Sequence, residues 1–333
     1  GSTVAFARSI ALLGEDFKSV RPTIIVSVPR IFEKLHGQIQ STLNSASSMK
    51  RSMFERAHHV GWDMFEWKQG RGSWKPAFLL WPLLKALVAD KLLERLGGRL
   101  RLCISGGAAL NPQIARTFIG LGLPICQGYG LTEASPIVSV NHLDRNDPAS
   151  IGMVLPGIEV SLGKNQVLLV RGPTVMQGYW KDEEATAKVI SAEGWLDTGD
   201  QVMMKDGFLY ITGRLKEIIV LGNGEKVPPV DMELAIQLDP DIDQALVIGE
   251  GKSFLAALLV LKPGAKRLDD KAMTAKVAAQ LKDFPGYAQV RRVAVIEEPW
   301  TVDNGMLTST LKLRRAQILE RDKAQVNEVY KGK

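Results

Sequence analysis

Cysteine is scarce in this sequence. The chain has 333 residues and only two cysteines, Cys103 and Cys126. Each lies in a short apolar run, RLRLCIS or LPICQG, without the spacing of zinc ligands. We therefore expect two buried free thiols and neither a zinc site nor a disulfide framework. No secretory signal pattern opens the chain, and free thiols suit a reducing compartment, so the sequence predicts a cytoplasmic protein.

Long apolar runs are also absent. The most apolar stretch is AFLLWPLL at residues 77–84, which Pro82 interrupts and Lys75 and Lys85 flank. A helix that crosses a bilayer needs about 20 apolar residues, so no transmembrane segment is predicted. We predict a core or interfacial helix here, and a peripheral membrane contact stays open as the alternative.

Long runs of basic residues with interleaved aromatics are missing, although the formal net charge is +6. A nucleic-acid partner is therefore not predicted. The mild excess of positive charge fits a solvated surface and is compatible with an anionic ligand. Hydrophobic residues make up 45% and charged residues 23% of the chain. These are ordinary globular values, and the length allows one large domain or two.

Strand and helix patterns alternate in the first half of the chain. The run TIIVSV predicts a strand, and helices are expected at residues 43–70 and at about 77–95, with a stop at Gly97 and Gly98. The strand run RLRLCIS, a glycine loop, a helix at 111–120 and the strand LPICQ follow. This alternation predicts a mostly parallel sheet covered by helices.

The pattern changes after residue 150. Two hairpins are predicted, one turning at residues 163–165 and one at Asp206-Gly207, because Asp-Gly favours the primed turns. The last 115 or so residues have the length of a small domain. The fold class is α/β: residues 1–215 form a partial large domain with a helix-covered sheet and a β-rich subdomain, and residues 216–333 form a small C-terminal α+β domain. In the small domain we expect strands at 243–248, 254–261 and 290–296 and helices from 230, at 268–282 and at the C-terminus.

Five segments contain residue types suited to nucleotide chemistry. Each of them alone has an ordinary explanation as a turn, a solvated face or a helix end. Together and in this order they resemble the adenylate-forming superfamily, which includes acyl-CoA synthetases, luciferases and nonribosomal peptide adenylation domains, over essentially the whole chain. The segments are SGGAALNP (105–112), QGYGLTEASP (127–136), GWLDTGDQ (194–201), GRLKEIIVLGNGEKVPP (213–229) and LTSTLKLRR (307–315).

Within that superfamily the sequence is most similar to the long-chain fatty acyl-CoA synthetases. The segments VPRIFEKL (28–35), GEKVPPVDME (224–233) and LTSTLKLRR carry this closer resemblance. It implies that ATP and Mg²⁺ activate a long-chain fatty acid, which is then transferred to coenzyme A, giving acyl-CoA, AMP and pyrophosphate. A fatty acyl-AMP ligase that delivers to a carrier protein, and a non-catalytic nucleotide-binding fragment, stay open as alternatives.

The resemblance implies a set of nucleotide-binding residues. Small residues let the backbone approach a flat base closely, and Tyr129 would give adenine an aromatic face. The Asp200 carboxylate would accept hydrogen bonds from the ribose hydroxyls, and Arg214 would reach the ribose or phosphate region. The implied residues are Gly106, Gly107, Ala108, Gly128, Tyr129, Gly130, Thr132, Asp200 and Arg214.

The implied catalytic residues are Thr132, Glu133 and Lys312. Thr132 would offer a hydroxyl to the phosphates, and Glu133 a hard carboxylate oxygen to Mg²⁺. Lys312 would bridge carboxylate and phosphate oxygens as a mobile point charge. Lys216 matches the hinge about which the small domain turns between two half-reactions. The loop after the hinge would meet CoA through Gly222, Asn223, Gly224 and Glu225.

One element of the resemblance is missing. The Ser/Thr/Gly-rich phosphate loop of the family, of the form TSGTTGxPKG, occurs nowhere in the sequence, and neither does G-x-x-x-x-G-K-[ST]. Backbone amides of such loops cradle the terminal phosphates of a nucleotide. The sequence therefore resembles an N-terminally truncated family member, and we expect these 333 residues alone not to form acyl-CoA.

Overall fold

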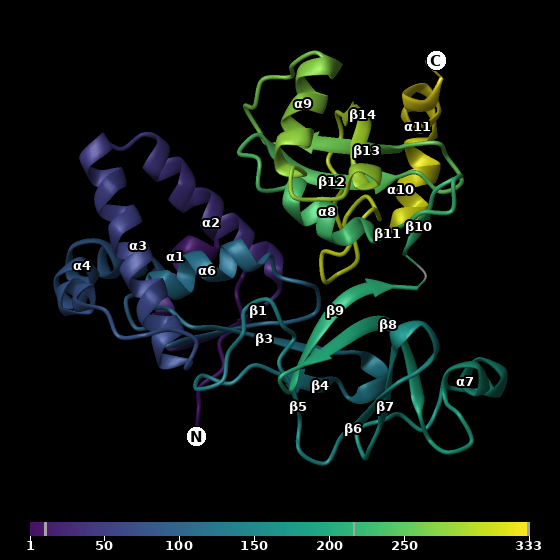
Figure 1. Cartoon of the computed structure of the whole chain (residues 1–333), viewed down its shortest axis with the longest axis horizontal. Coiled ribbons are helices and arrows are strands. Elements are labelled where there is room, and N and C mark those ends of the chain that lie inside the picture. The colour runs from purple at the N-terminus through teal and green to yellow at the C-terminus, as the bar shows by residue number, and fades with distance from the viewer. Residues whose placement is uncertain (10–11, 216, 332–333) are drawn as a thin grey trace. The chain divides into compact units, whose positions relative to one another are not determined.

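The computed structural model describes residues 1–9, 12–215 and 217–331 (Figure 1). The chain divides into two compact units. Unit 1 contains Gly1–Leu162, Leu169–Thr198 and Met203–Ile211, and unit 2 contains Gly163–Leu168, Gly199–Val202 and Thr212–Lys333. The domain boundary expected between residues 215 and 216 stays a prediction, since Lys216 lies outside the described residues.

The main sheet of unit 1 has five strands in the order β1-β2-β3-β4-β5. The pairings β1–β2 and β2–β3 are parallel, whereas β3–β4 and β4–β5 are antiparallel. The expectation of a mostly parallel sheet is therefore wrong beyond β3. The chain reverses direction between the end of β3 and the start of β4. The Leu131 N–H closes this turn by donating to the Pro136 carbonyl at 2.8 Å. The strands are β1 (Ile24–Ser27), β2 (Leu102–Ser105), β3 (Ile125–Gly130), β4 (Ile137–Val140) and β5 (Met153–Val154).

Helices cover this sheet as predicted, and they pack closely on one another. Phe32 of α2 meets Phe118 of α6 edge to face, with ring centroids 6.1 Å apart. A Cβ on Gly61 of α3 would lie 2.0 Å from the Gly120 carbonyl oxygen of α6, so only glycine permits this approach. Proline or asparagine marks two of the helix starts, at Pro29 and Asn111. The helices are α1 (Leu13–Val20), α2 (Pro29–Asn44), α3 (Ser48–Lys68) and α6 (Pro112–Gly120).

The single helix predicted at about 77–95 is instead a series of short helical pieces. Pro82 has no N–H, and a π-helical turn follows it, so regular α-helical hydrogen bonding is interrupted. The stop at Gly97 is confirmed, because this residue ends the series in the left-handed conformation with φ 93°. The pieces are a 3₁₀ turn (Pro76–Leu80), α4 (Trp81–Leu84), the π turn (Lys85–Ala89), α5 (Asp90–Leu93) and a 3₁₀ turn (Glu94–Leu96).

A second sheet contains both predicted hairpins, in the strand order β6-β7-β8-β9. Asn165 has φ 58° in the first turn, and Asp206 and Gly207 have φ 52° and 84° in the second. Two positive φ angles in succession are typical of the type I′ turn that Asp-Gly favours. The elements are β6 (Glu159–Leu162), β7 (Val167–Arg171), α7 (Glu183–Val189), β8 (Leu196–Lys205) and β9 (Phe208–Arg214).

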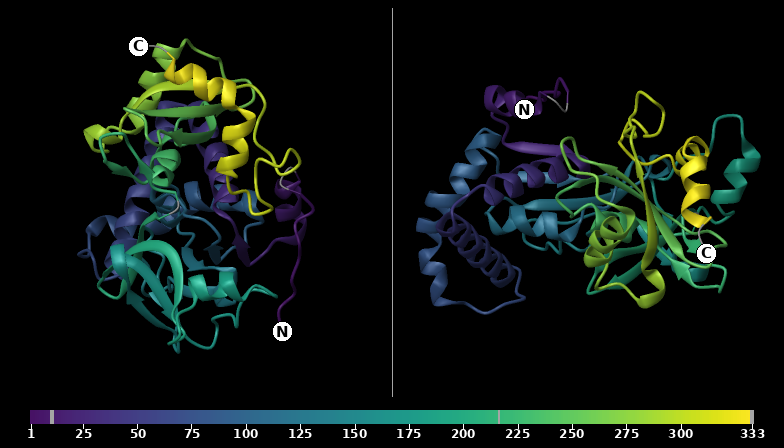
Figure 2. Two further views of the ribbon diagram at one scale, coloured as in Figure 1. Left: turned by 90° about the vertical axis from the view of Figure 1, so that its right-hand side faces the viewer. Right: turned by 90° about the horizontal axis from the view of Figure 1, so that it is seen from above.

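The C-terminal part of unit 2 has three layers, with a sheet between two pairs of helices (Figures 1 and 2). Alternate residues of β12 and β13 enter two cores: Val247 and Ala257 face α8 and α9, whereas Leu246 and Leu258 face α10 and α11. The C-terminal helix predicted from sequence is two helices. The elements are β10 (Ile219–Val220), β11 (Lys226–Val227), α8 (Pro229–Ile236), β12 (Ile242–Ile248), β13 (Leu255–Leu261), α9 (Asp270–Gln280), β14 (Val290–Ile296), α10 (Arg315–Arg321) and α11 (Lys323–Tyr330).

Both cysteines are free and buried, as predicted. They lie on neighbouring strands, and burial raises the pKa of Cys103 to about 12 and that of Cys126 to about 11. Neither thiol is therefore a nucleophile at neutral pH. No helix among the described residues has both the length and the apolar content needed to cross a membrane.

Candidate active site

The glycine loop begins where β2 ends, beside the carboxyl end of β3. Ser105 pairs with Gln127, so the residues that follow them, Gly106 and Gly128, are neighbours. A Cβ on Gly106 would have only the Gly128 carbonyl oxygen near it, at 3.8 Å. Gly107 has φ 84°, and it is exposed together with Ala108. Ligands of α/β sheets bind outside the carboxyl ends of the strands, which is where these predicted adenine-pocket residues lie.

A buried polar network supports this edge of the sheet. The Leu110 N–H donates to Gln127 Oε1 at 2.7 Å, and Gln127 Nε2 donates to the Ser150 carbonyl at 3.0 Å. Asn141 Nδ2 donates to the Gln127 carbonyl at 3.3 Å. Gln127 thus ties the glycine loop to the loop that follows β4, and buried hydrogen bonds of this kind favour a single geometry.

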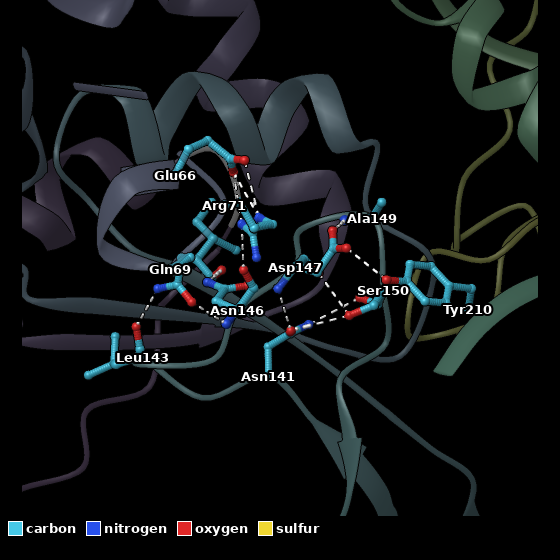
Figure 3. Close-up of polar contacts among 11 residues, drawn as sticks. Glu66, Gln69, Arg71, Asn141, Leu143, Asn146, Asp147, Ala149, Ser150 and Tyr210 are labelled. Carbon is cyan, nitrogen blue, oxygen red and sulfur yellow. Dashed lines mark hydrogen bonds and ion pairs between the residues drawn. The ribbon is translucent and has the colours of Figure 1, made fainter. Parts of the chain in front are cut away.

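Figure 3 shows how that second loop is itself held. Asn141 accepts the Asp147 N–H at 2.9 Å, and Asp147 accepts the Tyr210 hydroxyl at 2.7 Å. From the segment that follows α3, Arg71 donates to the Asn146 carbonyl at 3.0 Å. Burial and the Asp147 carboxylate raise the pKa of Tyr210 to about 12, so this hydroxyl keeps its proton. Side chains from the segment after α3 and from β9 therefore hold the loop on which Gln127 depends.

The GYGLTE segment ends β3 in a turn that only glycine can begin. A Cβ on Gly130 would lie 1.7 Å from the Pro136 carbonyl oxygen. Thr132 opens a 3₁₀ turn, Thr132–Ala134, and its side chain is exposed. Ser135 closes the turn with φ 53°. The turn therefore presents Thr132 and Glu133 close to the strand end that carries Tyr129.

Glu133 has a hydrogen-bond partner that sequence reasoning did not identify. The Tyr179 hydroxyl donates to Glu133 Oε1 at 2.8 Å, and the Met176 N–H donates to the Glu133 carbonyl, also at 2.8 Å. The hydrogen bond to Glu133 raises the pKa of Tyr179 above its usual value, because ionisation would place two negative charges together. The segment 172–182 thus fixes both the backbone and the side chain of Glu133.

The loop that carries Tyr179 is itself anchored at the start of α7. The Tyr179 N–H donates to Thr186 Oγ1 at 2.9 Å, and that hydroxyl donates to the Asp182 carbonyl at 2.8 Å. Asp182 also caps α7 by accepting the Ala185 N–H at 2.9 Å. A Cβ on Gly178 would lie 2.9 Å from Thr186 side-chain atoms. Gly178 was the available sequence signal, since glycine is favoured where another group approaches the backbone closely.

The residues around Glu133 fit a nucleotide-bound Mg²⁺ and not a metal cage built by protein alone. No group of three or more His, Cys, Asp or Glu side chains that could hold a metal occurs among residues 1–9, 12–215 and 217–331. Mg²⁺ at nucleotide sites takes one or two carboxylates and completes its coordination with phosphate oxygens and water. Tyr179 uses Glu133 Oε1, and the half-buried carboxylate retains Oε2 as a hard ligand.

Unit 2 brings together two of the predicted ribose-site residues, Asp200 and Arg214. Arg214 Nε lies 3.0 Å from Asp200 Oδ1, and the Asp200 side chain is largely buried. Glu217 lies 3.7 Å from the same guanidinium, and the Leu215 N–H donates to the Gly199 carbonyl at 3.0 Å. The carboxylate is thus oriented by a cation on the adjacent strand.

Lys312 lies on a separate turn of unit 2. The Thr308 N–H donates to the Lys312 carbonyl at 2.9 Å, and the Lys312 N–H donates to Thr308 Oγ1 at 3.0 Å. Leu311 adopts the left-handed conformation with φ 63°, which costs a non-glycine residue about 1–3 kcal/mol. The Lys312 side chain is exposed. The turn is thus held through its backbone and leaves the lysine side chain at the surface.

A buried ion pair holds the chain directly after this turn, and the sequence analysis missed it. Arg315 Nη1 lies 2.7 Å from Glu233 Oε1 of α8, and Arg315 Nη2 donates to the Val247 carbonyl at 2.6 Å. The Val247 N–H also donates to Glu233 Oε1, at 2.7 Å. Burial raises the pKa of Glu233, although Arg315 favours the charged form. The only sequence signal was that both residues belong to segments singled out by the resemblance.

The turn predicted to meet CoA is a hairpin turn between β10 and β11. Gly224 has φ 86°, the Leu221 N–H donates to the Glu225 carbonyl at 2.9 Å, and Asn223 Oδ1 accepts the Glu225 N–H at 3.1 Å. Gly222, Asn223, Gly224 and Glu225 are all exposed. The predicted hinge residue, Lys216, lies outside the described residues.

Comparison with protein families gives matches along most of the chain. The family described as AMP-binding enzyme matches residues 1–180, and the AMP-binding enzyme C-terminal domain matches residues 216–333. The long-chain-fatty-acid–CoA ligase FadD15 of Mycobacterium bovis is 33% identical over 353 residues, which cover 98% of this chain and 58% of that protein. The chloroplastic long-chain-fatty-acid–[acyl-carrier-protein] ligase AEE15 of Arabidopsis thaliana is 30% identical, over 97% of this chain and 52% of that protein.

Solved structures show the same fold. The adenylation domain of the carboxylic acid reductase from Segniliparus rugosus, in complex with AMP and a co-purified carboxylic acid, matches with a TM-score of 0.74 and 23% identity. That match covers 96% of this chain and 49% of the other. This chain thus spans little more than half the length of the relatives it matches. With family matches over both parts of the sequence, the resemblance is confirmed, and the chain belongs to the AMP-binding enzyme family of adenylate-forming enzymes.

Proposed function

We propose that the parent activity of this chain is the ATP-dependent activation of a long-chain fatty acid and its transfer to CoA. The observation that carries the proposal is the meeting of the Gly106–Ala108 loop with Gly128 at the carboxyl ends of two parallel strands. Glycine has no side chain and alanine only a methyl group, so the backbone there leaves room for a flat base. The identity to the M. bovis protein named long-chain-fatty-acid–CoA ligase supports the acyl substrate.

On this proposal the end of β3 and the turn after it hold the nucleotide and its metal. Tyr129 gives the adenine an aromatic face, and the exposed Thr132 hydroxyl donates to a phosphate oxygen. Glu133 offers Oε2 to Mg²⁺ while Tyr179 occupies Oε1. When bound, Mg²⁺ would neutralise negative charge on the phosphates. The anionic fatty acid could then approach the anionic nucleotide.

The proposed roles in unit 2 concern the ribose and the reacting oxygens. Asp200 accepts the ribose hydroxyls, and Arg214 both orients that carboxylate at 3.0 Å and supplies positive charge. Lys312 carries an ammonium on an exposed, flexible side chain, so it can follow oxygens that move as the acyl–phosphate bond forms. Positive charge placed where anionic charge develops is the main catalytic device at such a site.

The proposed domain arrangement follows the predicted boundary. Residues 1–215 form the C-terminal part of the large domain, residues 216–333 form the small domain, and Lys216 is the hinge. Rotation about a few backbone dihedrals would exchange Lys312 for the exposed turn Gly222–Glu225, which would then receive CoA. We also propose a cytoplasmic location, and AMP, ATP and fatty acid as the small-molecule partners.

For the 333 residues by themselves we propose nucleotide binding without turnover. The printed sequence has no Ser/Thr/Gly-rich loop to cradle the terminal phosphates, whereas its adenine and ribose residues are present. The experiment measures binding of a fluorescent AMP analogue and fatty-acid-dependent ATP–pyrophosphate exchange on the purified chain. We expect saturable AMP binding and no exchange above background.

Variants make this experiment specific. Asp200→Ala is expected to weaken AMP binding at least tenfold, since the ribose hydroxyls lose a charged acceptor. Asp197→Ala, an exposed carboxylate on the same strand, is the matched control and should bind like the unmodified chain. Binding unaffected by Asp200→Ala would reject the ribose site. Exchange at the rate of a full-length relative would reject the proposed lack of turnover.

A second candidate differs only in the acyl acceptor. The A. thaliana relative is named as an acyl-carrier-protein ligase, and at 30% identity it is almost as similar as the CoA ligases. Surface plasmon resonance of the chain with CoA and with a phosphopantetheinylated carrier protein separates the two acceptors. Binding of CoA that is lost on Gly224→Pro supports the first candidate, whereas binding of the carrier protein alone supports the second.

A further inference from the structure

The glycine loop that follows β2 is held at both ends by hydrogen bonds. At its start the Gly106 N–H donates to the Ser27 carbonyl of β1 at 3.1 Å. At its end the Leu110 N–H donates to Gln127 Oε1 at 2.7 Å. Residues 106–109 are two glycines and two alanines, which have little side chain to pack. The position of the loop therefore depends on how firmly its two ends are held.

The Gln127 anchor is itself held by the support loop, which we define as residues 141–150. Gln127 Nε2 donates to the Ser150 carbonyl at 3.0 Å, and Asn141 Nδ2 donates to the same carbonyl at 3.1 Å. Asn141 Nδ2 also donates to the Gln127 carbonyl at 3.3 Å, and the Ser150 hydroxyl donates to Asn141 Oδ1 at 3.2 Å. All three side chains are buried. The support loop therefore fixes both the side chain and the backbone of Gln127.

Strand β9 in turn holds the support loop, as Figure 3 shows for Tyr210. The Tyr210 hydroxyl donates to Asp147 Oδ2 at 2.7 Å, and the Asp147 N–H donates to Asn141 Oδ1 at 2.9 Å. One residue earlier on β9, the Leu209 carbonyl accepts the Ile151 N–H at 2.8 Å. The backbone bond places β9 beside the end of the support loop, and the Tyr210 hydroxyl connects the strand to Asn141.

Together these contacts form one hydrogen-bonded path, and all of its residues belong to unit 1. In order they are Tyr210, Asp147, Asn141, Gln127 and Leu110. The path begins at a half-buried hydroxyl, and its middle is buried, with Asn141 3% and Gln127 6% exposed. A hydrogen bond adds little net stability compared with an apolar contact of the same shape, but in a buried network it favours a single geometry. The path is therefore better suited to positioning the glycine loop than to stabilising the fold.

We propose that Tyr210 is a positioning residue for nucleotide binding, which acts through Asp147 and Gln127 on the glycine loop. The inference rests on the proposed function, because it assigns that loop to the adenine base. Tyr210 is not among the residues proposed to contact the nucleotide. Its hydroxyl restricts the geometries of the loop before AMP arrives, so less ordering has to occur on binding.

The experiment measures displacement of a fluorescent AMP analogue by AMP and by ribose 5-phosphate, which lacks the base. Tyr210→Phe removes only the hydroxyl. We expect this variant to bind AMP about threefold more weakly, because the loop beneath the base is less well placed. Ribose 5-phosphate should bind to both proteins equally, since it makes no contact with an adenine pocket. A general loss of stability would instead weaken the binding of both ligands.

Further variants test the path itself. Asp147→Asn keeps a polar group opposite the Tyr210 hydroxyl and should bind AMP nearly as tightly as the unmodified chain, whereas Asp147→Ala should bind it at least as weakly as Tyr210→Phe. In Gln127→Ala the path is cut next to the loop, so adding Tyr210→Phe should weaken AMP binding no further. Tyr287→Phe, at a tyrosine that is 45% exposed in unit 2, is the control and should have no effect.

Hydrogen exchange gives a measurement that needs no ligand. Tyr210→Phe should speed exchange of the Leu110 amide, which donates to Gln127 Oε1, by about threefold. The Gly106 amide, bonded to the Ser27 carbonyl at the other end of the loop, is the internal control and should exchange at its original rate. The same measurement decides the question if Gln127→Ala does not fold.

Two results would overturn the proposal. One is equal weakening of AMP and ribose 5-phosphate binding by Tyr210→Phe together with a lower unfolding midpoint, which would make the hydroxyl a stabilising group only. The other is an unchanged AMP affinity or an unchanged exchange rate of the Leu110 amide in that variant. If the unmodified chain binds neither ligand, the proposed function fails, and the Leu110 amide still decides whether Tyr210 holds the loop.

Discussion

Glu133 and Lys312 lie on two short turns that the protein holds in different ways. In unit 1 the Glu133 side chain itself is held, by the Tyr179 hydroxyl at 2.8 Å. In unit 2 the Lys312 side chain is exposed, and only its backbone is held, by Thr308 and by the Glu233–Arg315 ion pair that begins the next helix.

The difference fits the chemistry proposed for each residue. A metal ligand works best when its carboxylate is oriented before the metal arrives, because ordering then costs less on binding. A lysine that must follow moving oxygens needs a fixed base and a free side chain. The protein therefore fixes the side chain of Glu133 in one turn and only the backbone of Lys312 in the other.

The largest effect is expected from breaking the anchor of the Lys312 turn. Arg315→Ala leaves the Glu233 carboxylate buried without its cation, which costs about 3–5 kcal/mol. The change is measured by hydrogen exchange of the Val247 amide, which donates to Glu233 Oε1 at 2.7 Å. Arg314→Ala, one residue earlier and exposed, is the control and should leave that amide protected. Equal effects of the two variants would show that the anchor lies elsewhere.

The next effect concerns the glycines of unit 1. A Cβ at Gly130 would lie 1.7 Å from the Pro136 carbonyl, so Gly130→Ala should destabilise unit 1 by about 1–3 kcal/mol. Gly106→Ala meets nothing closer than 3.8 Å and should leave the unfolding midpoint unchanged. Both are measured by urea unfolding. If Gly106→Ala weakens AMP binding without loss of stability, the predicted adenine pocket gains direct support.

A smaller effect is expected on the pKa of Tyr179 when its hydrogen bond to Glu133 is removed. The pKa of Tyr179 is raised by that bond, so Glu133→Gln should lower it towards the value of about 10 for a free phenol. The titration is followed by NMR of ¹³C-labelled tyrosine. Tyr210, whose pKa of about 12 depends on burial and Asp147, is the internal control and should not move. A Tyr179 pKa that stays raised in Glu133→Gln would mean that the carboxylate is not held by this residue.

The smallest effect is expected for Lys312 itself. Its exposed side chain is not needed to hold the turn, so Lys312→Ala should change stability by no more than about 0.5 kcal/mol. Thr308→Ala removes the hydroxyl that accepts the Lys312 N–H at 3.0 Å and should destabilise the turn by about 1 kcal/mol. Denaturant midpoints measure both. A larger loss in Lys312→Ala than in Thr308→Ala would remove the contrast between the two turns.

Local patterns predicted much of the architecture because their causes are local. Asp206-Gly207 forms the expected hairpin turn, β14 covers the predicted residues 290–296, and Gly97 ends a helical series as a left-handed cap. Each depends on the conformational freedom of one or two residues or on alternation along one strand. The helix predicted at about 77–95 was wrong in detail because its apolar character gave no sign of the interrupted hydrogen bonds.

The sequence by itself determined the family of the chain, the glycine positions of its turns and the alternation of its strands, since each follows from residue types at short spacing. Only the tertiary structure decided which distant side chains meet. Tyr179 reaches Glu133 across 46 positions, and Arg315 reaches Glu233 across 82. Such contacts depend on packing between elements, which spacing along one chain does not encode.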